Sequence, residues 1–247
     1  MSAPVDLSTL WNYLTHTPLL AIALTLCAYL CAMKIAEKLH FSPLANPVVI
    51  AVAMIILVLS GTGISYADYF SAAQPIHLML GPVTVALAIP LARQLPRLRK
   101  IAFPLGVGLL LGSLTAIMSA VLIIIWMQGS YQLALSIGPK SATTPIAMGI
   151  AEKIGGIPSV AAAIVIVTGA IGALVARYLF NWMRISSPEI RGFALGLAAH
   201  GIGTARGFQV SKEIGTFAGL GMGLNGILTA FLAPALVPVI VNYFFRQ

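Results

Sequence analysis

The chain has 247 residues, of which 59% are hydrophobic and 8% are charged, and its formal net charge is +8. A soluble domain carries about 25% charged residues, so this composition excludes a water-facing globular surface. Several uncharged runs each exceed the roughly 20 residues that a helix needs to cross a bilayer. These runs are Phe41–Ala67, Tyr69–Ala92, Ile101–Pro139, Ile154–Ala176 and Ile214–Phe245. The composition predicts an all-α polytopic membrane protein, with residues 1–247 as one integral domain in the lipid bilayer and no soluble domain.

The basic residues indicate topology rather than a nucleic-acid partner. Lys34 and Lys38 follow the first predicted span, and residues 93–100 hold a second basic cluster after the third span. Two crossings separate these clusters, so both lie on one side, which the positive-inside tendency assigns to the cytoplasm. The N-terminus is then expected outside, and its first residues lack the basic region of a cleaved signal peptide.

Hydrophobic runs and helix breakers divide the chain into about seven expected transmembrane helices plus a re-entrant or broken-helix segment. A polar turn is expected over 61–75, and Pro234 and Pro238 are expected to bend or end the last helix. The expected helices cover residues 16–33, 44–60, 76–92, 101–127, 157–176, 193–209 and 214–245.

The broken segment is SIGPKSATTPIAMGI, residues 136–150. A lysine at bilayer depth, here Lys140, costs about 2.5–3.5 kcal/mol on insertion scales. Gly138 tolerates unusual dihedral angles, and Pro139 has no N–H to donate, so both disrupt a regular helix. The freed backbone groups must face protein or a water-filled cavity, because lipid cannot satisfy them.

The rest of this segment carries hydroxyl groups and a second proline. Ser141, Thr143 and Thr144 could satisfy freed backbone groups or contact a solute. Pro145 suits the first turn of a new helix, whose N–H groups and positive dipole end would point at the break. Together with Lys140 this predicts an anion site, and the alternative is a lysine that snorkels to the interface beside a structural kink.

The path of this segment decides on which side of the membrane the later arginines lie. A full crossing would place Arg177, Arg184 and Arg191 outside, whereas a segment that dips in and returns would place them and Arg246 inside. The positive-inside tendency favours the re-entrant path, and a crossing with an unwound middle stays open.

A second candidate lies in AAHGIGTARG. Helical spacing would put His200 and Thr204 on one face, with Arg206 to one side. Gly201 and Gly203 permit close approach of backbones. His200 could carry a coupled proton or be a hydrogen-bonded structural residue. Arg206 could bind a carboxylate or mark the membrane edge.

Further breaks carry no charge, and structural kinking is favoured for them. They are the polar helix start at Asn46 and the interruptions at Gly81, Pro82 and Pro90. No motif or cluster indicates catalytic residues, a metal or a cofactor, so no enzymatic activity is expected. A weak internal repeat with a spacing of about 60 residues is also visible. It aligns Lys140, Thr144, Ile154 and Gly155 with His200, Thr204, Ile214 and Gly215. Paired interrupted segments of this kind point to the binding site of a transporter.

The stretches LANPVVIA, GPVTVALAIPL, PKSATTPIAMGIAEKIGGIP and AAHGIGTARG resemble the LrgB/CidB family of bacterial inner-membrane proteins over nearly the whole chain. The resemblance implies an antiholin-like regulator of murein hydrolase export and cell lysis. Such proteins work beside a small holin-like LrgA/CidA membrane partner. It also implies a link to a plastid glycolate/glycerate transporter and to pyruvate movement, and a homo-oligomer such as a dimer.

Two functions are therefore expected from different classes. The first is a secondary transporter of small carboxylates such as pyruvate, glycolate or glycerate, with the two broken segments lining the path. The second is the antiholin-like regulator, in which the polar breaks only shape an oligomer.

Overall fold

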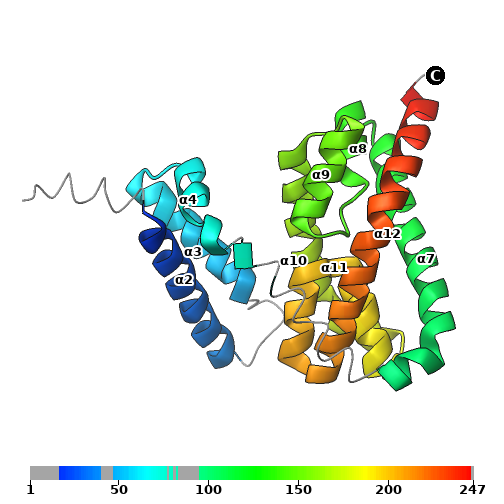
Figure 1. The fold of residues 1–247 in the computed structure, drawn as a ribbon, viewed down its shortest axis with the longest axis horizontal. Coiled ribbons are helices and arrows are strands. Elements are labelled where there is room, and N and C mark those ends of the chain that lie inside the picture. Colours follow the sequence, from blue (N-terminus) through cyan, green and yellow to red (C-terminus); the bar gives the residue numbers. More distant parts are fainter. Residues whose placement is uncertain (1–16, 40–46, 77, 80–81, 83–94, 246–247) are drawn as a thin grey trace, which may run out of the picture. The chain divides into compact units, whose positions relative to one another are not determined.

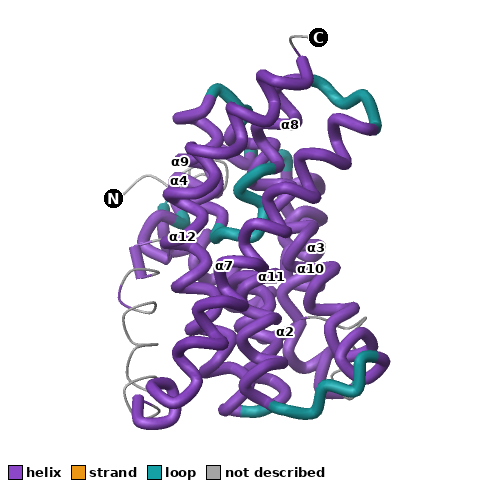
Figure 2. The backbone as a smooth tube through the Cα atoms, turned by 90° about the vertical axis from the view of Figure 1, so that its right-hand side faces the viewer, coloured by secondary structure: helices purple, strands orange, loops and turns teal. Residues whose placement is uncertain are grey.

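The computed structural model describes residues 17–39, 47–76, 78–79, 82 and 95–245, and these residues form helices joined by short turns (Figure 1). Figure 2 shows the same backbone by secondary structure, without a strand in the described part. The chain divides into two compact units, Met1–Ile89 and Pro90–Gln247, and each is described by itself. The expectation of a single integral domain over 1–247 stays a prediction.

The first unit contains helices α2 (Pro18–Lys38), α3 (Pro47–Thr62) and α4 (Tyr66–Ala72). Ala28 and Ala32 of α2 pack against Ala51 of α3, and these small side chains let the two helices approach closely. Helix α4 bends away from α3 by 119°. Its link to α2 is a hydrogen bond of 2.7 Å between the hydroxyl groups of Tyr69 and Thr25.

The polar turn expected over 61–75 is wrong in part, because α4 forms within it. Ser65 caps this helix by accepting a hydrogen bond of 3.1 Å from the backbone N–H of Asp68. A serine three residues before an aspartate is a helix start signal that outweighs the polarity of the stretch. Most of the helix expected over 76–92 lies outside the described residues.

The second unit combines three long helices with three shorter elements. The long helices are α7 (Leu95–Trp126), α10 (Pro158–Trp182) and α12 (Lys212–Phe245). The shorter elements are α8 (Tyr131–Ile137), α9 (Thr144–Ile154) and α11 (Pro188–Val210). Helix α12 continues through Pro234 and Pro238, so of the two expected effects these prolines do not end the helix, and a bend at them stays a prediction.

Four helices in the described part are long and apolar enough to cross a membrane: α2, α7, α10 and α12. Counting the bent pair α3–α4 as one span raises the number to five. The expected number of about seven is not confirmed, and the chain is a multi-pass membrane protein.

Helices α8 and α9 fold back on each other as hairpin 1, which comprises residues 131–157. The seven residues of α8 and the eleven of α9 rise about 10 and 17 Å, so neither could cross a bilayer alone. The Ser136 hydroxyl of α8 accepts a hydrogen bond of 2.8 Å from the backbone N–H of Ile157, just beyond α9. The chain therefore leaves hairpin 1 beside the last turn of α8.

Helix α11 is also a hairpin, although its two arms are continuous in sequence. His200 has non-helical angles (φ 41°, ψ −129°) and separates a first arm, 188–199, from a second arm, 201–210. A Cβ atom added at Gly203 would lie 2.6 Å from the carbonyl oxygen of Leu195. In a straight helix these positions would be about 12 Å apart along the axis. We call this folded element hairpin 2. The sequence indicated an interrupted helical segment over 193–209, and the structure shows that the chain folds back on itself at His200.

The two hairpins enter the second unit from opposite ends. Helix α10 connects the end of hairpin 1 to the start of hairpin 2, and its 25 residues rise about 38 Å. In Figure 1, α8 and α9 occupy the upper half of this unit and α11 the lower half, whereas α7 and α12 run its full height. The hairpin tips therefore approach each other near the middle.

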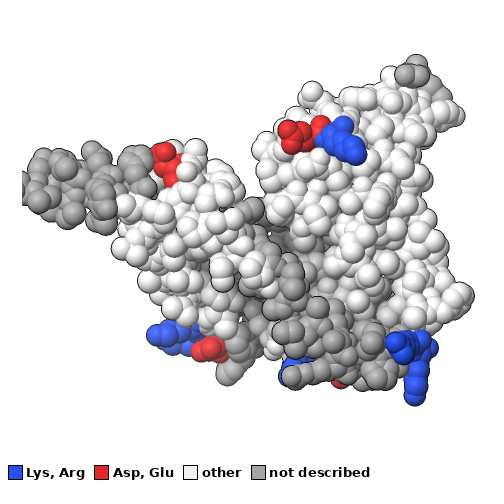
Figure 3. All heavy atoms as spheres, viewed as in Figure 1, with Lys and Arg blue, Asp and Glu red and all other residues white. Residues whose placement is uncertain are grey.

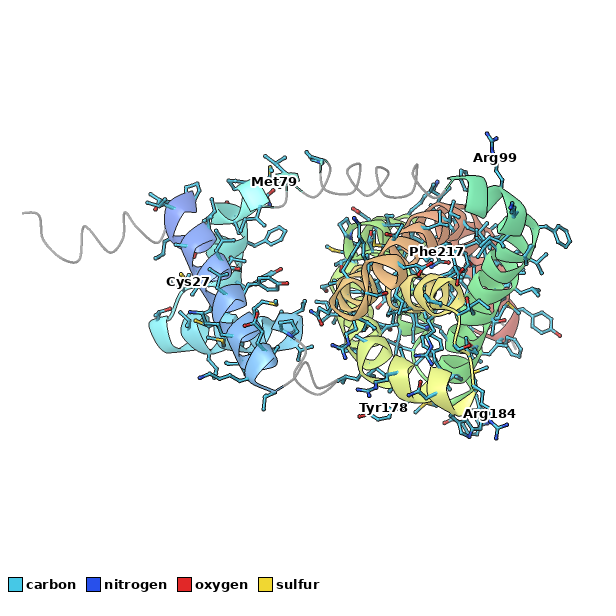
Figure 4. All side chains as sticks on the ribbon, turned by 90° about the horizontal axis from the view of Figure 1, so that it is seen from below. Cys27, Met79, Arg99, Tyr178, Arg184 and Phe217 are labelled. Carbon is cyan, nitrogen blue, oxygen red and sulfur yellow. The ribbon has the colours of Figure 1, made fainter. Side chains whose placement is uncertain are left out.

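On the face of the second unit that Figure 3 shows, the charged side chains lie towards its ends. In Figure 3 the surface between the two ends of this unit is white, which marks uncharged residues, and the coloured charged atoms lie only near the top and bottom. Figure 4, which views the unit from below, shows Arg99 and Arg184 pointing outward from its periphery. This distribution fits a helical bundle whose middle part is covered by lipid.

Candidate anion site at the hairpin tips

The tip of hairpin 1 is a turn that holds Lys140 inside the second unit. The backbone N–H of Lys140 donates to the carbonyl of Ile137 (3.1 Å), and that of Ala142 donates to Pro139 (2.9 Å). Gly138 keeps helical angles (φ −49°, ψ −51°), so backbone freedom is not its role. A Cβ atom there would lie 2.6 Å from Val237 of α12, so Gly138 provides space for close packing.

The Lys140 side chain is partly buried, and its Nζ donates a hydrogen bond of 3.3 Å to the Ser141 hydroxyl. Helix α9 begins next to it, with Pro145 in its first turn as expected from the sequence. Thr143 occupies the N-cap position, and its side chain makes no capping hydrogen bond. The first N–H groups of α9 thus lack the usual side-chain acceptor, at the end of the helix where the dipole is positive.

The tip of hairpin 2 is His200, which is 4% exposed. Its Nε2 lies 2.8 Å from the carbonyl oxygen of Val165 in α10. Because a carbonyl only accepts, Nε2 must carry a hydrogen, and Nδ1 is the nitrogen that can gain or lose a proton. Gly169 makes room for this contact, since a Cβ atom there would lie 2.7 Å from the ring.

Thr204 lies one turn into the second arm of hairpin 2. Its hydroxyl donates 2.9 Å back to the carbonyl of His200, and it also contacts the sulfur of Met222 at 3.7 Å. The second arm of hairpin 2 begins at Gly201, so a second helix N-terminus is present at the tips. Gly203 packs closely against the first arm.

Asn225 of α12 connects the two hairpins. Its amide nitrogen donates to the backbone carbonyls of Ser141 and Leu197, both at 3.0 Å. Ser141 belongs to the tip of hairpin 1, and Leu197 to the last turn of the first arm of hairpin 2. The carbonyl of Leu197 loses its helical partner at the break, whereas that of Ser141 lies in the turn between α8 and α9, and the amide satisfies both.

Hydroxyl groups hold the Asn225 amide in position. Its Oδ1 accepts from Ser113 of α7 at 2.5 Å and from Thr229 at 3.4 Å. Asn225 is 0% exposed, and Ser113 and Thr229 are almost fully buried. Helices α7 and α12 and the two hairpin tips thus share one buried hydrogen-bond network.

Lys140 and His200 lie at the two tips that Asn225 joins, next to Ser141 and three residues after Leu197, respectively. Arg206 is 9% exposed and lies six residues along the second arm, about 9 Å beyond the tip. Its Nη1 donates 3.2 Å to the side chain of Gln209, and its charge interacts with that of Arg177. The structure thus brings Lys140, Ser141 and His200 together and places Arg206 towards the base of hairpin 2.

The spacing of sixty residues recurs in these contacts. Lys140 and His200 lie at the two tips, and the same spacing relates Val165 of α10 to Asn225 of α12. Val165 receives the tip of hairpin 2, and Asn225 receives the tip of hairpin 1. Equivalent positions on α10 and α12 therefore hold the opposite hairpin.

Asn225, Ser113 and Thr229 were not among the residues expected from the sequence. The signal that could have found Asn225 is an amide side chain within the long uncharged run Ile214–Phe245, because polar groups at bilayer depth need partners. Of the other expected helix breaks, Asn46, Gly81 and Pro90 lie outside the described residues. Pro82 is helical and exposed.

Comparison with known proteins places this chain in a family. It is 36% identical to the uncharacterized protein YwbG of Bacillus subtilis (strain 168) over 222 residues, covering 89% of this chain and 97% of the relative. It is 30% identical to the holin-like protein CidB of Staphylococcus epidermidis (strain ATCC 12228 / FDA PCI 1200) over 229 residues, covering 92% and 96%. No solved structure matches. The LrgB-like family matches residues 25–239, and the chain belongs to this family.

Proposed function

We propose that this protein is a secondary transporter of small carboxylates such as pyruvate, glycolate or glycerate. One observation carries the proposal: the tips of two opposed hairpins meet at a buried junction that holds Lys140 and the N-terminus of α9. A carboxylate needs a cation and backbone N–H donors, and this junction offers both. The hydroxyl groups of Ser141, Thr143 and Thr144 would bind the second oxygen function of a keto or hydroxy acid.

The arrangement of the hairpins supports movement of the solute across the membrane. A hairpin followed by a long helix occurs twice, as α8–α9–α10 and as α11–α12, and α10 places the two hairpins at opposite ends. We interpret this as an inverted repeat with two re-entrant segments. Transporters with inverted repeats bind solute at the repeat interface and expose it alternately to the two sides.

The proposal includes location and assembly. The basic ends of α7 and α11 would face the cytoplasm, which places the N-terminus outside the bacterial inner membrane. A small LrgA/CidA-like protein is the proposed membrane partner, and a homodimer is the proposed assembly. Gly108 of α7 is open, with nothing within 4 Å of an added Cβ atom, and would permit close contact between subunits. No chemical conversion of the solute is proposed.

Labelled carboxylate movement in proteoliposomes tests this function. Counterflow of pyruvate or glycolate is expected for the wild type, and Lys140→Ala is expected to reduce it about a hundredfold, because a charge-assisted hydrogen bond is lost. Lys153→Ala is the matched control, since Lys153 lies in the same hairpin and is exposed. Equal rates for the two variants, or no counterflow with the LrgA-like protein present, would contradict the proposal.

The second candidate is an antiholin-like regulator of murein hydrolase export and cell lysis. Relatives that are 30% identical are named holin-like protein CidB, and this favours the second candidate. In that case the hairpins would shape an assembly, and Lys140→Ala would change lysis without any carboxylate flux in the wild type.

A further inference from the structure

The two helix breaks do not by themselves select the sign of a bound ion. Each break exposes the C-terminus of one helical segment and the N-terminus of the next. These ends carry about −0.5 and +0.5 elementary charge. Free carbonyls at such a break suit a cation, and free N–H groups suit an anion. Another side chain must therefore determine whether the carbonyls or the N–H groups stay available to an ion.

Asn225 is placed on the carbonyl side of both breaks. Its two amide hydrogens have one acceptor in each hairpin, the carbonyls of Ser141 and Leu197 at 3.0 Å. The opposite orientation of the amide is excluded, because the hydroxyls of Ser113 and Thr229 donate to Oδ1 and carbonyls cannot donate. The donors of Asn225 are thus fully used by the two breaks.

We propose that Asn225 is the positioning residue that makes this junction select anions. By occupying carbonyls of both hairpins, it removes acceptors from a cation and leaves Lys140 and the N-terminus of α9 to face the solute. Asn225 touches no solute itself and acts through the two carbonyls. This inference rests on the proposed binding of carboxylates at the same junction.

Asn225→Asp is the most direct test, because it preserves shape while removing both donors and adding a negative charge. The freed carbonyls and the new carboxylate would form an oxygen cage suited to a hard cation. We expect choline glycolate to raise the melting temperature of detergent-purified wild type relative to choline chloride. Sodium chloride in place of choline chloride should have no effect on the wild type.

In Asn225→Asp the apparent affinity for glycolate should fall by at least about tenfold, since two backbone carbonyls lose their donor and a negative charge is added beside the site. Sodium or calcium chloride should now raise the melting temperature. The matched control is Asn242→Asp on the same helix, where the Asn242 side chain accepts 2.9 Å from the exposed Tyr131 hydroxyl. This control should keep the wild-type response to both ions.

Several outcomes would overturn the inference. One is an increase of the Asn225→Asp melting temperature by glycolate that equals the wild-type increase. Another is loss of this increase while sodium and calcium chloride still leave the melting temperature unchanged. If Asn225→Asp does not fold, Asn225→Ala removes the donors without adding charge and should weaken the glycolate response at least about tenfold. An unchanged response in that variant, or loss of folded protein in both variants, would show a structural role alone.

The same variants separate this inference from the proposed function. Carboxylate binding by the wild type and a reversed ion response in Asn225→Asp, without counterflow, would support the inference and contradict transport. Counterflow in the wild type that Asn225→Asp retains would support transport and contradict the inference.

Discussion

Hairpin 1 turns through six residues that contain Pro139 and precede Pro145, whereas hairpin 2 turns at the single residue His200. In hairpin 1, prolines remove backbone donors, and the hydroxyl of Ser136 ties the last turn of α8 to the residue Ile157 after α9. In hairpin 2, glycines bring backbones into direct contact. The same depth is thus reached once through side-chain hydrogen bonds and once through close packing, and the two hairpins should differ in their tolerance of substitution.

The largest expected effect breaks the packing of hairpin 2. A Cβ atom at Gly196 would overlap the backbone carbonyl of Ala218 in α12. Gly196→Val should therefore cost more than about 3 kcal/mol of folding free energy and leave little folded protein by size-exclusion chromatography. Gly223→Ala on α12, where nothing lies within 4 Å, should behave as the wild type. A monodisperse Gly196→Val protein with the wild-type melting temperature would remove the contrast between the hairpins.

The next effect concerns the contact between hairpin 2 and α10. Gly169→Ala would press on the His200 ring and break its hydrogen bond to Val165, at a cost of about 1–3 kcal/mol measured by thermal unfolding in detergent. His200→Gly removes the ring and relieves a positive φ, so the double variant should lose less than the sum of the two single effects. Strict additivity would argue against this contact. Gly149→Ala, in open space within hairpin 1, is the control.

A smaller loss is expected when the side-chain tie of hairpin 1 is removed. Ser136→Ala leaves the partly buried N–H of Ile157 without its acceptor, which should cost about 1–2 kcal/mol in the same unfolding assay. The exposed Thr62 hydroxyl bonds only within its own helix, so Thr62→Ala should change the melting temperature little. If Ser136→Ala lost as much folding free energy as Gly196→Val, the two hairpins would not differ in their tolerance of substitution.

The smallest effect tests the junction between the hairpins. Ser113→Ala removes one hydrogen bond to Asn225 and leaves that from Thr229, so we expect a loss of about 1 kcal/mol. Cooperativity of unfolding should remain unchanged, and carboxylate affinity should fall by less than about threefold. If Ser113→Ala lowered the carboxylate affinity as much as Lys140→Ala does, the Ser113–Asn225 network rather than Lys140 would be the main binding determinant.

The sequence predicted the helical class and the first break because proline, lysine and hydroxyl residues are local signals. It did not predict hairpin 2 as a hairpin, because the turn at His200 has no proline and depends on tertiary contacts with Val165 and α12. Gly203 suggested close approach, but its partner, Leu195, is known only from the fold. Asn225 was missed for the same reason: its acceptors lie 84 and 28 residues away.

The distance along the chain between Ser141 and Asn225 has a consequence for biogenesis. Ser141 leaves the ribosome 84 residues before Asn225 does. At about 5–20 residues per second, this interval lasts roughly 4–17 s. During that time hairpin 1 is in the membrane without the amide that satisfies its tip. Until α12 arrives, the insertion machinery or water within the bilayer must supply a hydrogen-bond donor to the Ser141 carbonyl. The tip of hairpin 1 thus receives its permanent donor only after α12 has been made.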